Sequence, residues 1–105
     1  MDEYLYAIDL YNYAYWWESH ELLERLWLAA GRNTKQGSFF RALIQLAAAN
    51  LKRFVGYGQA ADNLTSRGIT RLEQVPDSYM GIDVANLINY LKEHRREAAP
   101  LIRLA

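Results

Sequence analysis

Residues 39–51 read FFRALIQLAAANL, a run that is apolar on nearly every side of a helix. A helix without a polar face lies in the middle of a bundle, because neighbouring helices must cover it all round. The run is broken by Gln45 and Asn50, and it is far shorter than the roughly 20 residues needed to cross a bilayer. It therefore predicts a central core helix over residues 35–55, with Thr34 as its N-cap.

Helical periodicity also marks the segments on both sides of this core helix, and no segment alternates apolar and polar residues as a half-buried strand does. Glycine or proline separates the segments at Gly31, Gly56 and Pro76. The sequence therefore predicts an all-α fold, a compact single-domain bundle of about five helices with a central αα-hairpin. The expected helices cover residues 3–13, 15–30, 35–55, 59–75 and 83–96, the last of them capped by Asp83. A tail at residues 98–105 follows, and whether it docks, self-associates or stays loose is left open.

Charge and composition exclude several kinds of partner. The 12 Lys and Arg residues balance 12 Asp and Glu residues and neither sign forms a block, so we expect no nucleic-acid partner. Cysteine is absent, which excludes disulfides and leaves only oxygen and imidazole ligands for a metal. The chain carries Asp2 and Glu3 where a signal peptide carries basic residues. We expect a cytosolic protein without a membrane partner.

The second helix brings polar residues onto a face that should be buried. Residues 16–27 read WWESHELLERLW, and a helical wheel places His20 near the centre of the apolar face, with Glu24 one turn further at its edge. A histidine and a glutamate at this spacing can supply two ligands to one metal, or the carboxylate can fix the tautomer of the histidine. A metal site needs a third protein ligand, and neither HExxH nor HxxxH is present.

The core helix offers a second pair of polar residues, Arg41 and Gln45, one turn apart. A buried glutamine needs hydrogen-bond partners for its amide, and His20 or Glu24 on the facing helix are the obvious candidates. Arg41 can pair with Glu24. One interpretation is a buried polar network of His20, Glu24, Arg41 and Gln45 that fixes how the two helices meet; the other is a functional site.

These two segments together resemble the small helical family catalogued as domain of unknown function 309. The family signature is an aromatic-rich EAHE-x-x-E-x-x-W segment followed by F-x-x-G-L-I-Q-x-A. The resemblance extends through residues 81–84, and it implies an all-helical fold and the catalogue label of predicted metal-dependent hydrolase. The positions that match the family pattern are Glu18, His20, Glu21, Glu24, Trp27 and Gln45.

The chain departs from the family at positions that bear on a metal. Arg41 stands where the family usually has glutamine, and the histidines that often follow the alanine run are replaced around Leu51 and Lys52. An arginine beside Glu24 would compete with a divalent ion for the carboxylate. We therefore expect no cofactor, with a divalent metal on His20 and Glu24 as the alternative.

Aromatic residues are concentrated near the start of the chain, where eight of the 14 lie within residues 1–27. Trp16 and Trp17 point about 100° apart on a helix, so when one faces the core the other lies near the surface. Tyrosine and tryptophan are favoured at protein interfaces. Tyr13, Trp16 and Trp17 therefore form a candidate contact surface, most simply for a homodimer; the alternative is that these rings pack between helices.

Two functions from different classes follow. The first is a small interaction or scaffold module whose polar network is structural and whose aromatic surface binds a second copy or another protein. The alternative is a metal-dependent hydrolase in which His20 and Glu24 bind a divalent metal, Gln45 positions water or substrate, and Glu21 serves as the base.

Overall fold

The computed structural model describes residues 2–94, 102 and 103, which form five helices and one short hairpin. The helices are α1 (Asp2–Asn12), α2 (Trp16–Ala30), α3 (Lys35–Phe54), α4 (Gly58–Leu72) and α5 (Val84–Glu93). The strands are β1 (Ser78–Tyr79) and β2 (Ile82–Asp83). The all-α prediction is confirmed, and the expected end of the last helix at residue 96 lies outside the described residues.

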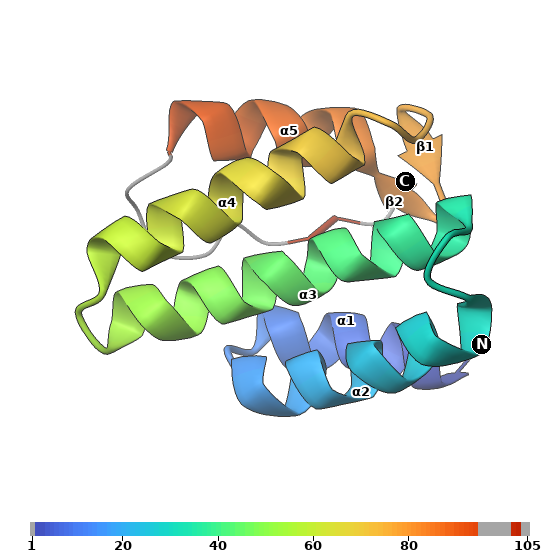
Figure 1. The fold of residues 1–105 in the computed structure, drawn as a ribbon, viewed down its shortest axis with the longest axis horizontal. Helices are drawn as coiled ribbons and strands as arrows, with labels where there is room; N and C mark the ends of the chain where they lie inside the picture. The colour runs from blue at the N-terminus through green and yellow to red at the C-terminus, as the bar shows by residue number, and fades with distance from the viewer. Residues whose placement is uncertain (1, 95–101, 104–105) are drawn as a thin grey trace.

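α3 is the central helix, packed against α2 on one side and α4 on the other, with α1 behind α2 and α5 above and behind α4 in the view of Figure 1. α1 also packs on α3, where the Tyr4 and Phe40 ring centroids lie 5.8 Å apart. Its start is fixed by Thr34, whose Oγ1 accepts a hydrogen bond from the Gly37 backbone N–H at 2.9 Å. A Cβ added at Gly37 would collide with the carbonyl oxygen of Gly31, so only glycine allows the chain to turn this tightly into α3. None of the helices in the described ranges is long and apolar enough to span a membrane.

The hairpin between α4 and α5 was not foreseen by the sequence interpretation. Its turn holds Met80 at φ 49° and Gly81 at φ 77°, the pair of positive values that a two-residue hairpin turn requires. Tyr79 pairs with Ile82 across it, and the Tyr79 ring packs edge-on to Phe39 of α3 with centroids 5.0 Å apart. Strands of two residues are too short to produce an alternating pattern, so the sequence could not reveal them.

Two residues of the expected tail dock on the body of the protein. Ile102 is buried, and its backbone forms two hydrogen bonds with the side chain of Asn12, at 2.8 Å from its N–H and 3.0 Å to its carbonyl. The Arg103 carbonyl accepts a hydrogen bond from the Asp83 backbone N–H at 3.0 Å. These contacts favour docking over the other two possibilities for this part of the tail; residues 98–101, 104 and 105 lie outside the described residues.

Candidate functional site

The buried face of α2 centres on Ser19 and Leu23 rather than on His20. Both residues are fully buried, and the Ser19 hydroxyl donates a hydrogen bond to the Ala7 carbonyl of α1 at 2.9 Å. His20 lies at the edge of this face, with 24% of its side chain exposed. The expectation of a central His20 is wrong, because the small serine lets α1 pack closely at the position nearest the centre.

His20 has two side-chain neighbours on the surface of α2. Its Nε2 lies 3.6 Å from Glu24 Oε2, beyond hydrogen-bonding distance, and its ring stacks on Trp17 with centroids 5.5 Å apart. The other ring nitrogen, Nδ1, is buried without a hydrogen-bond partner. An open hollow of about 610 Å³ borders the pair, lined by Tyr6 of α1 and by Glu21 among others. Because Glu24 is half exposed, water screens this pair and it adds little stability.

Arg41 and Gln45 have neighbours other than the His20–Glu24 pair. The guanidinium carbon of Arg41 lies 4.8 Å from the centre of the Trp27 ring, a cation–π contact. Gln45 is buried and lines a hollow on the side of α4. In the described part of the chain, neither residue forms a hydrogen bond or ion pair with His20 or Glu24. The structure therefore brings together His20 and Glu24 of the four residues expected in a network. Arg41 lies on the α2 side of α3 but contacts Trp27, and Gln45 lies on the α4 side.

A bound metal ion would need at least a third protein ligand beside His20 and Glu24. Among residues 2–94, 102 and 103, no three His, Cys, Asp or Glu side chains lie close enough together to hold one ion. The other histidine, His94, follows the end of α5, and its ring lies 4.3 Å from that of Tyr90. The described residues thus do not fit a metal at the expected place, and they assign no catalytic step to Glu21 or Gln45.

The turn between α1 and α2 exposes aromatic side chains. Tyr13 is 77% exposed, and Tyr15 and Trp17 are also more than half exposed. Trp16 differs from them, because it is half-buried and packs against the hydrophobic core. Two of the three residues of the expected aromatic surface, Tyr13 and Trp17, therefore lie open to solvent.

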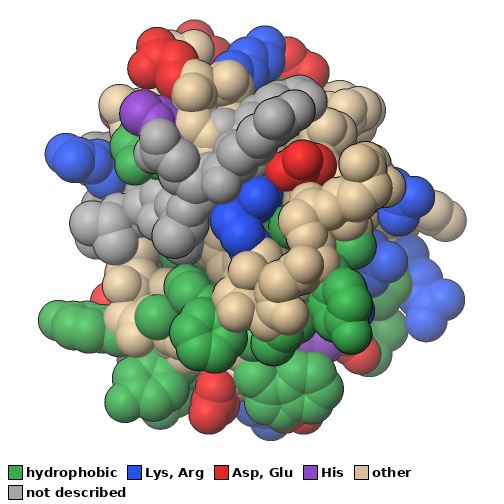
Figure 2. Space-filling model, turned by 90° about the vertical axis from the view of Figure 1, so that its left-hand side faces the viewer, with side chains coloured by type: hydrophobic (Ala, Val, Ile, Leu, Met, Phe, Trp, Pro, Cys, Tyr) green, Lys and Arg blue, Asp and Glu red, His purple; other side chains and the backbone are tan. Residues whose placement is uncertain are grey.

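The turn between α3 and α4 exposes a second apolar group at the same end of the bundle (Figure 1). Phe54 is 80% exposed, and Val55 and Tyr57 are more than half exposed. The Phe54 ring lies edge-on to Trp16 with centroids 6.3 Å apart, which joins the two turns. Figure 2 shows hydrophobic side chains gathered on the lower part of this face. We call the exposed group the aromatic end; its members are Tyr13, Tyr15, Trp17, Phe54, Val55 and Tyr57.

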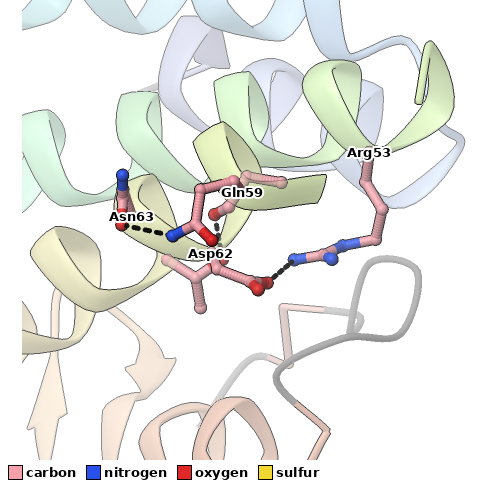
Figure 3. A network of polar contacts seen from close by, with 6 residues as sticks. Arg53, Gln59, Asp62 and Asn63 are labelled. Carbon is pink, nitrogen blue, oxygen red and sulfur yellow. Dashed lines mark hydrogen bonds and ion pairs between the residues drawn. The ribbon is translucent and has the colours of Figure 1, made fainter. Parts of the chain in front are cut away.

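Polar contacts hold the second turn in place (Figure 3). Arg53 Nη2 donates to Asp62 Oδ1 at 3.2 Å, and both side chains are partly buried. On the same helical turn, Gln59 Nε2 donates to Asn63 Oδ1 at 3.3 Å. The Arg53–Asp62 contact thereby ties the end of α3 to the start of α4.

Comparison with known proteins adds one finding. Residues 4–64 match the family described as Domain of unknown function (DUF309), and the match covers more than half of the 105 residues. The chain belongs to this family. The DUF309 match takes in α1, α2, α3 and the start of α4, with both turns of the aromatic end. Membership confirms the family resemblance over residues 4–64, whereas its expected extension through residues 81–84 lies beyond the match. The family assigns no reaction, and no curated protein matches the chain.

The sequence interpretation found only half of the aromatic end. It located the aromatic residues of α1 and α2 from their concentration in the chain. The other half, Phe54, Val55 and Tyr57, lies in a short glycine-containing stretch that the interpretation treated only as a turn. Antiparallel packing of α2 on α3 brings the end of α3 beside the start of α2. A signal was available, because three large apolar residues in a four-residue stretch beside Gly56 are unusual for a solvent-exposed turn.

Proposed function

We propose that this protein is an interaction module that forms a homodimer through its aromatic end. The observation that carries the proposal is the exposure of six large apolar side chains, each more than half accessible, on two turns at one end of the bundle. Exposed apolar groups that gather at one end of a protein and are rich in tyrosine and tryptophan characterise protein contact surfaces.

Charge around the aromatic end favours a second copy as the partner. Asp9 and Glu18 line a hollow together with Tyr13 and Tyr15, so the first turn lies in an acidic surrounding. On the second turn, the ammonium group of Lys52 lies 5.5 Å from the centre of the Tyr57 ring. A two-fold axis through the aromatic end would place the first turn of one copy against the second turn of the other. Opposite charges would then face each other in both halves of the interface.

The area available at the aromatic end is compatible with a dimer of modest affinity. A stable interface buries about 800 Å² on each partner, and a fully buried aromatic side chain covers about 150–250 Å². Five aromatic residues that are more than half exposed can therefore supply roughly 500 Å². Neighbouring side chains such as Val55 and Lys52 supply the remainder.

No specific observation favours the hydrolase alternative. His20 and Glu24 supply two ligands, and the hollow beside them lies open on the surface of α2. The proposed module acts in the cytosol, a location that a cysteine-free composition suits. We therefore place the function on the aromatic end rather than at His20 and Glu24.

Sedimentation velocity across protein concentrations from about 1 to 100 µM tests the proposal. The wild-type sedimentation coefficient should rise from the monomer to the dimer value. Trp17→Ser and Phe54→Ser, one in each half of the aromatic end, should each raise the dimer dissociation constant at least tenfold, or about 1.4 kcal/mol. Both side chains are exposed, so the monomer fold should be unchanged.

Leu28→Ser is the matched control, because Leu28 is 52% exposed near the other end of α2. It should leave the dissociation constant unchanged. A wild-type protein that stays monomeric over the whole range would contradict the proposal, as would an equal loss of dimer in the Leu28 control.

A further inference from the structure

The amide of Gln45 presents a buried acceptor that the fold leaves without a partner. Gln45 is only 6% exposed, and its Oε1 is fully buried with no hydrogen bond in the structure. A buried carbonyl oxygen without a donor is costly, and native proteins satisfy most such groups. Oε1 is closed to solvent, so an outside donor would remove this cost only when the Gln45 amide turns toward the hollow that its side chain lines.

Gln45 lines a hollow between α3 and α4 that is rich in positive charge. The hollow has a volume of about 430 Å³, within the range of small-molecule sites, and α4 contributes Arg67, Thr70 and Arg71 to its lining. Arg67 is exposed and forms no ion pair or hydrogen bond with any described residue. No acidic side chain lines this hollow among the residues that the structure describes.

A second hollow continues the first toward the start of α3. It shares Arg71 and Gln74 with the first hollow, and it adds Arg32 and Lys35. Arg71 Nη1 donates to Ser38 Oγ at 3.2 Å, which holds the guanidinium between the two hollows. The remaining N–H groups of a guanidinium fixed in this way can bind an oxyanion with two parallel hydrogen bonds.

We propose that the α3–α4 hollow binds a small organic anion that carries a phosphate or carboxylate group next to a hydroxyl or amide donor. Arg67 and Arg71 bind the oxyanion, and the Gln45 amide turns toward the hollow so that the neighbouring donor bonds to its Oε1. This site shares no lining residue with the aromatic end, so a failure of either proposal would leave the other untouched. Gln45 lies within the family match, whereas Arg67 and Arg71 lie beyond residue 64.

The test is a titration followed by ¹H–¹⁵N chemical shifts. Glycerol 3-phosphate and lactate each carry an oxyanion and a hydroxyl donor, inorganic phosphate carries the oxyanion alone, and glycerol carries the hydroxyls alone. At least one of the first two should saturate the shifts near Gln45 and Arg67 with a dissociation constant below about 1 mM. Inorganic phosphate should bind more weakly, and glycerol should not bind. Tighter binding of glycerol 3-phosphate would identify the oxyanion as a phosphate, and tighter binding of lactate would identify it as a carboxylate.

Three variants assign the roles. Arg67→Ala and Arg71→Ala should each weaken the tighter ligand at least tenfold, whereas Gln45→Met, which keeps the volume and removes the acceptor, should weaken it about fivefold. Gln45→Met should leave inorganic phosphate unchanged. Arg25→Ala is the control, because Arg25 is an exposed arginine on α2, away from this hollow.

Three results would overturn the proposal. One is the absence of saturable shifts with both glycerol 3-phosphate and lactate. Another is an equal loss of binding in Arg25→Ala, which would indicate nonspecific charge attraction. The third is an unchanged affinity in Gln45→Met, which would mean that water alone satisfies the buried acceptor.

Discussion

The two turns of the aromatic end share one backbone motif but differ in the residue that adopts the left-handed conformation, which is Ala14 in the first turn and Gly56 in the second. In the first turn, Tyr15 N–H donates to the Leu10 carbonyl at 2.8 Å, and the intervening Ala14 adopts φ 66°. In the second turn, Tyr57 N–H donates to the Lys52 carbonyl at 2.8 Å across Gly56 at φ 95°. Both are helix C-terminal motifs with a left-handed residue, and each places an exposed tyrosine directly after it.

The turns also differ in what holds them. The second turn is held locally, by Arg53 and Asp62. The first is held by distant residues: Asn12 binds the backbone of Ile102, and the Tyr11 ring is fully buried. Burial raises the pKa of the Tyr11 hydroxyl far above its ordinary value, and the nearby Asn50 side chain offsets only part of this rise. Tertiary contacts can therefore impose a left-handed conformation on an alanine, whereas a locally held turn uses glycine.

Ile102→Ala should lower the free energy of unfolding more than any other variant in this comparison, because Ile102 is 2% exposed and belongs to the core. Removing a buried isoleucine side chain costs about 2–5 kcal/mol. Urea denaturation at low protein concentration measures the loss. Val55→Ala removes an exposed branched side chain from the second turn and should change stability by less than about 0.5 kcal/mol. Equal effects of the two variants would mean that Ile102 does not hold the first turn.

Asn12→Ala should destabilise the protein by about 2 kcal/mol, because it removes two hydrogen bonds to the Ile102 backbone, each worth about 1 kcal/mol. Asn63→Ala is the matched change beside the second turn, where the asparagine accepts only one exposed bond from Gln59. Thermal melts of the two variants compare them directly. A smaller loss for Asn12→Ala than for Asn63→Ala would contradict the non-local support of the first turn.

Gly56→Ala should cost about 1–2 kcal/mol, because a left-handed conformation is unfavourable for any residue with a Cβ. A Cβ at Gly56 meets nothing within 4 Å, so the loss would come from the backbone alone. Gly58→Ala is the control; its Cβ also meets nothing, and it lies at the start of α4, where alanine is favourable. Calorimetry should show a lower melting temperature only for the first variant, and a drop for both would point to another cause.

Ala14→Gly should change stability least of these variants, and it should stabilise the protein rather than destabilise it. Glycine at φ 66° relieves the strain of the left-handed alanine, while its extra freedom in the unfolded chain offsets part of the gain. We expect a rise in the free energy of unfolding of about 0.5–1 kcal/mol, measured by urea denaturation. A loss of stability would show that the contacts around Ala14 need its methyl group.

Local signals in the sequence were sufficient for most of the fold. Thr34 and Asp83 cap their helices as expected, with hydrogen bonds of 2.9 and 3.0 Å to the backbone N–H groups three residues on. Gly31 ends α2 at φ 95°. Each of these residues acts within one helical turn, so its effect depends on its immediate neighbours in the chain.

The candidate sites depended on contacts that the sequence does not specify. α3 is apolar on nearly all sides, so its sequence could not indicate which neighbour Gln45 faces, and the side chain turns toward α4 instead of His20. Phe54 meets Trp16 only because α2 and α3 are antiparallel. Docking of Ile102 depends on contacts across 90 residues of chain, which no local pattern records.

The most direct test of the dimer is an isotope-filtered NOE experiment on an equal mixture of ¹³C,¹⁵N-labelled and unlabelled protein. A two-fold interface through the aromatic end predicts intermolecular NOEs between the Tyr13 or Tyr15 ring of one copy and the Phe54 or Tyr57 ring of the other. Trp17→Ser should remove them. The absence of intermolecular NOEs at a concentration where the protein is dimeric, or NOEs confined to the opposite end of α2 around Leu28, would contradict this interface.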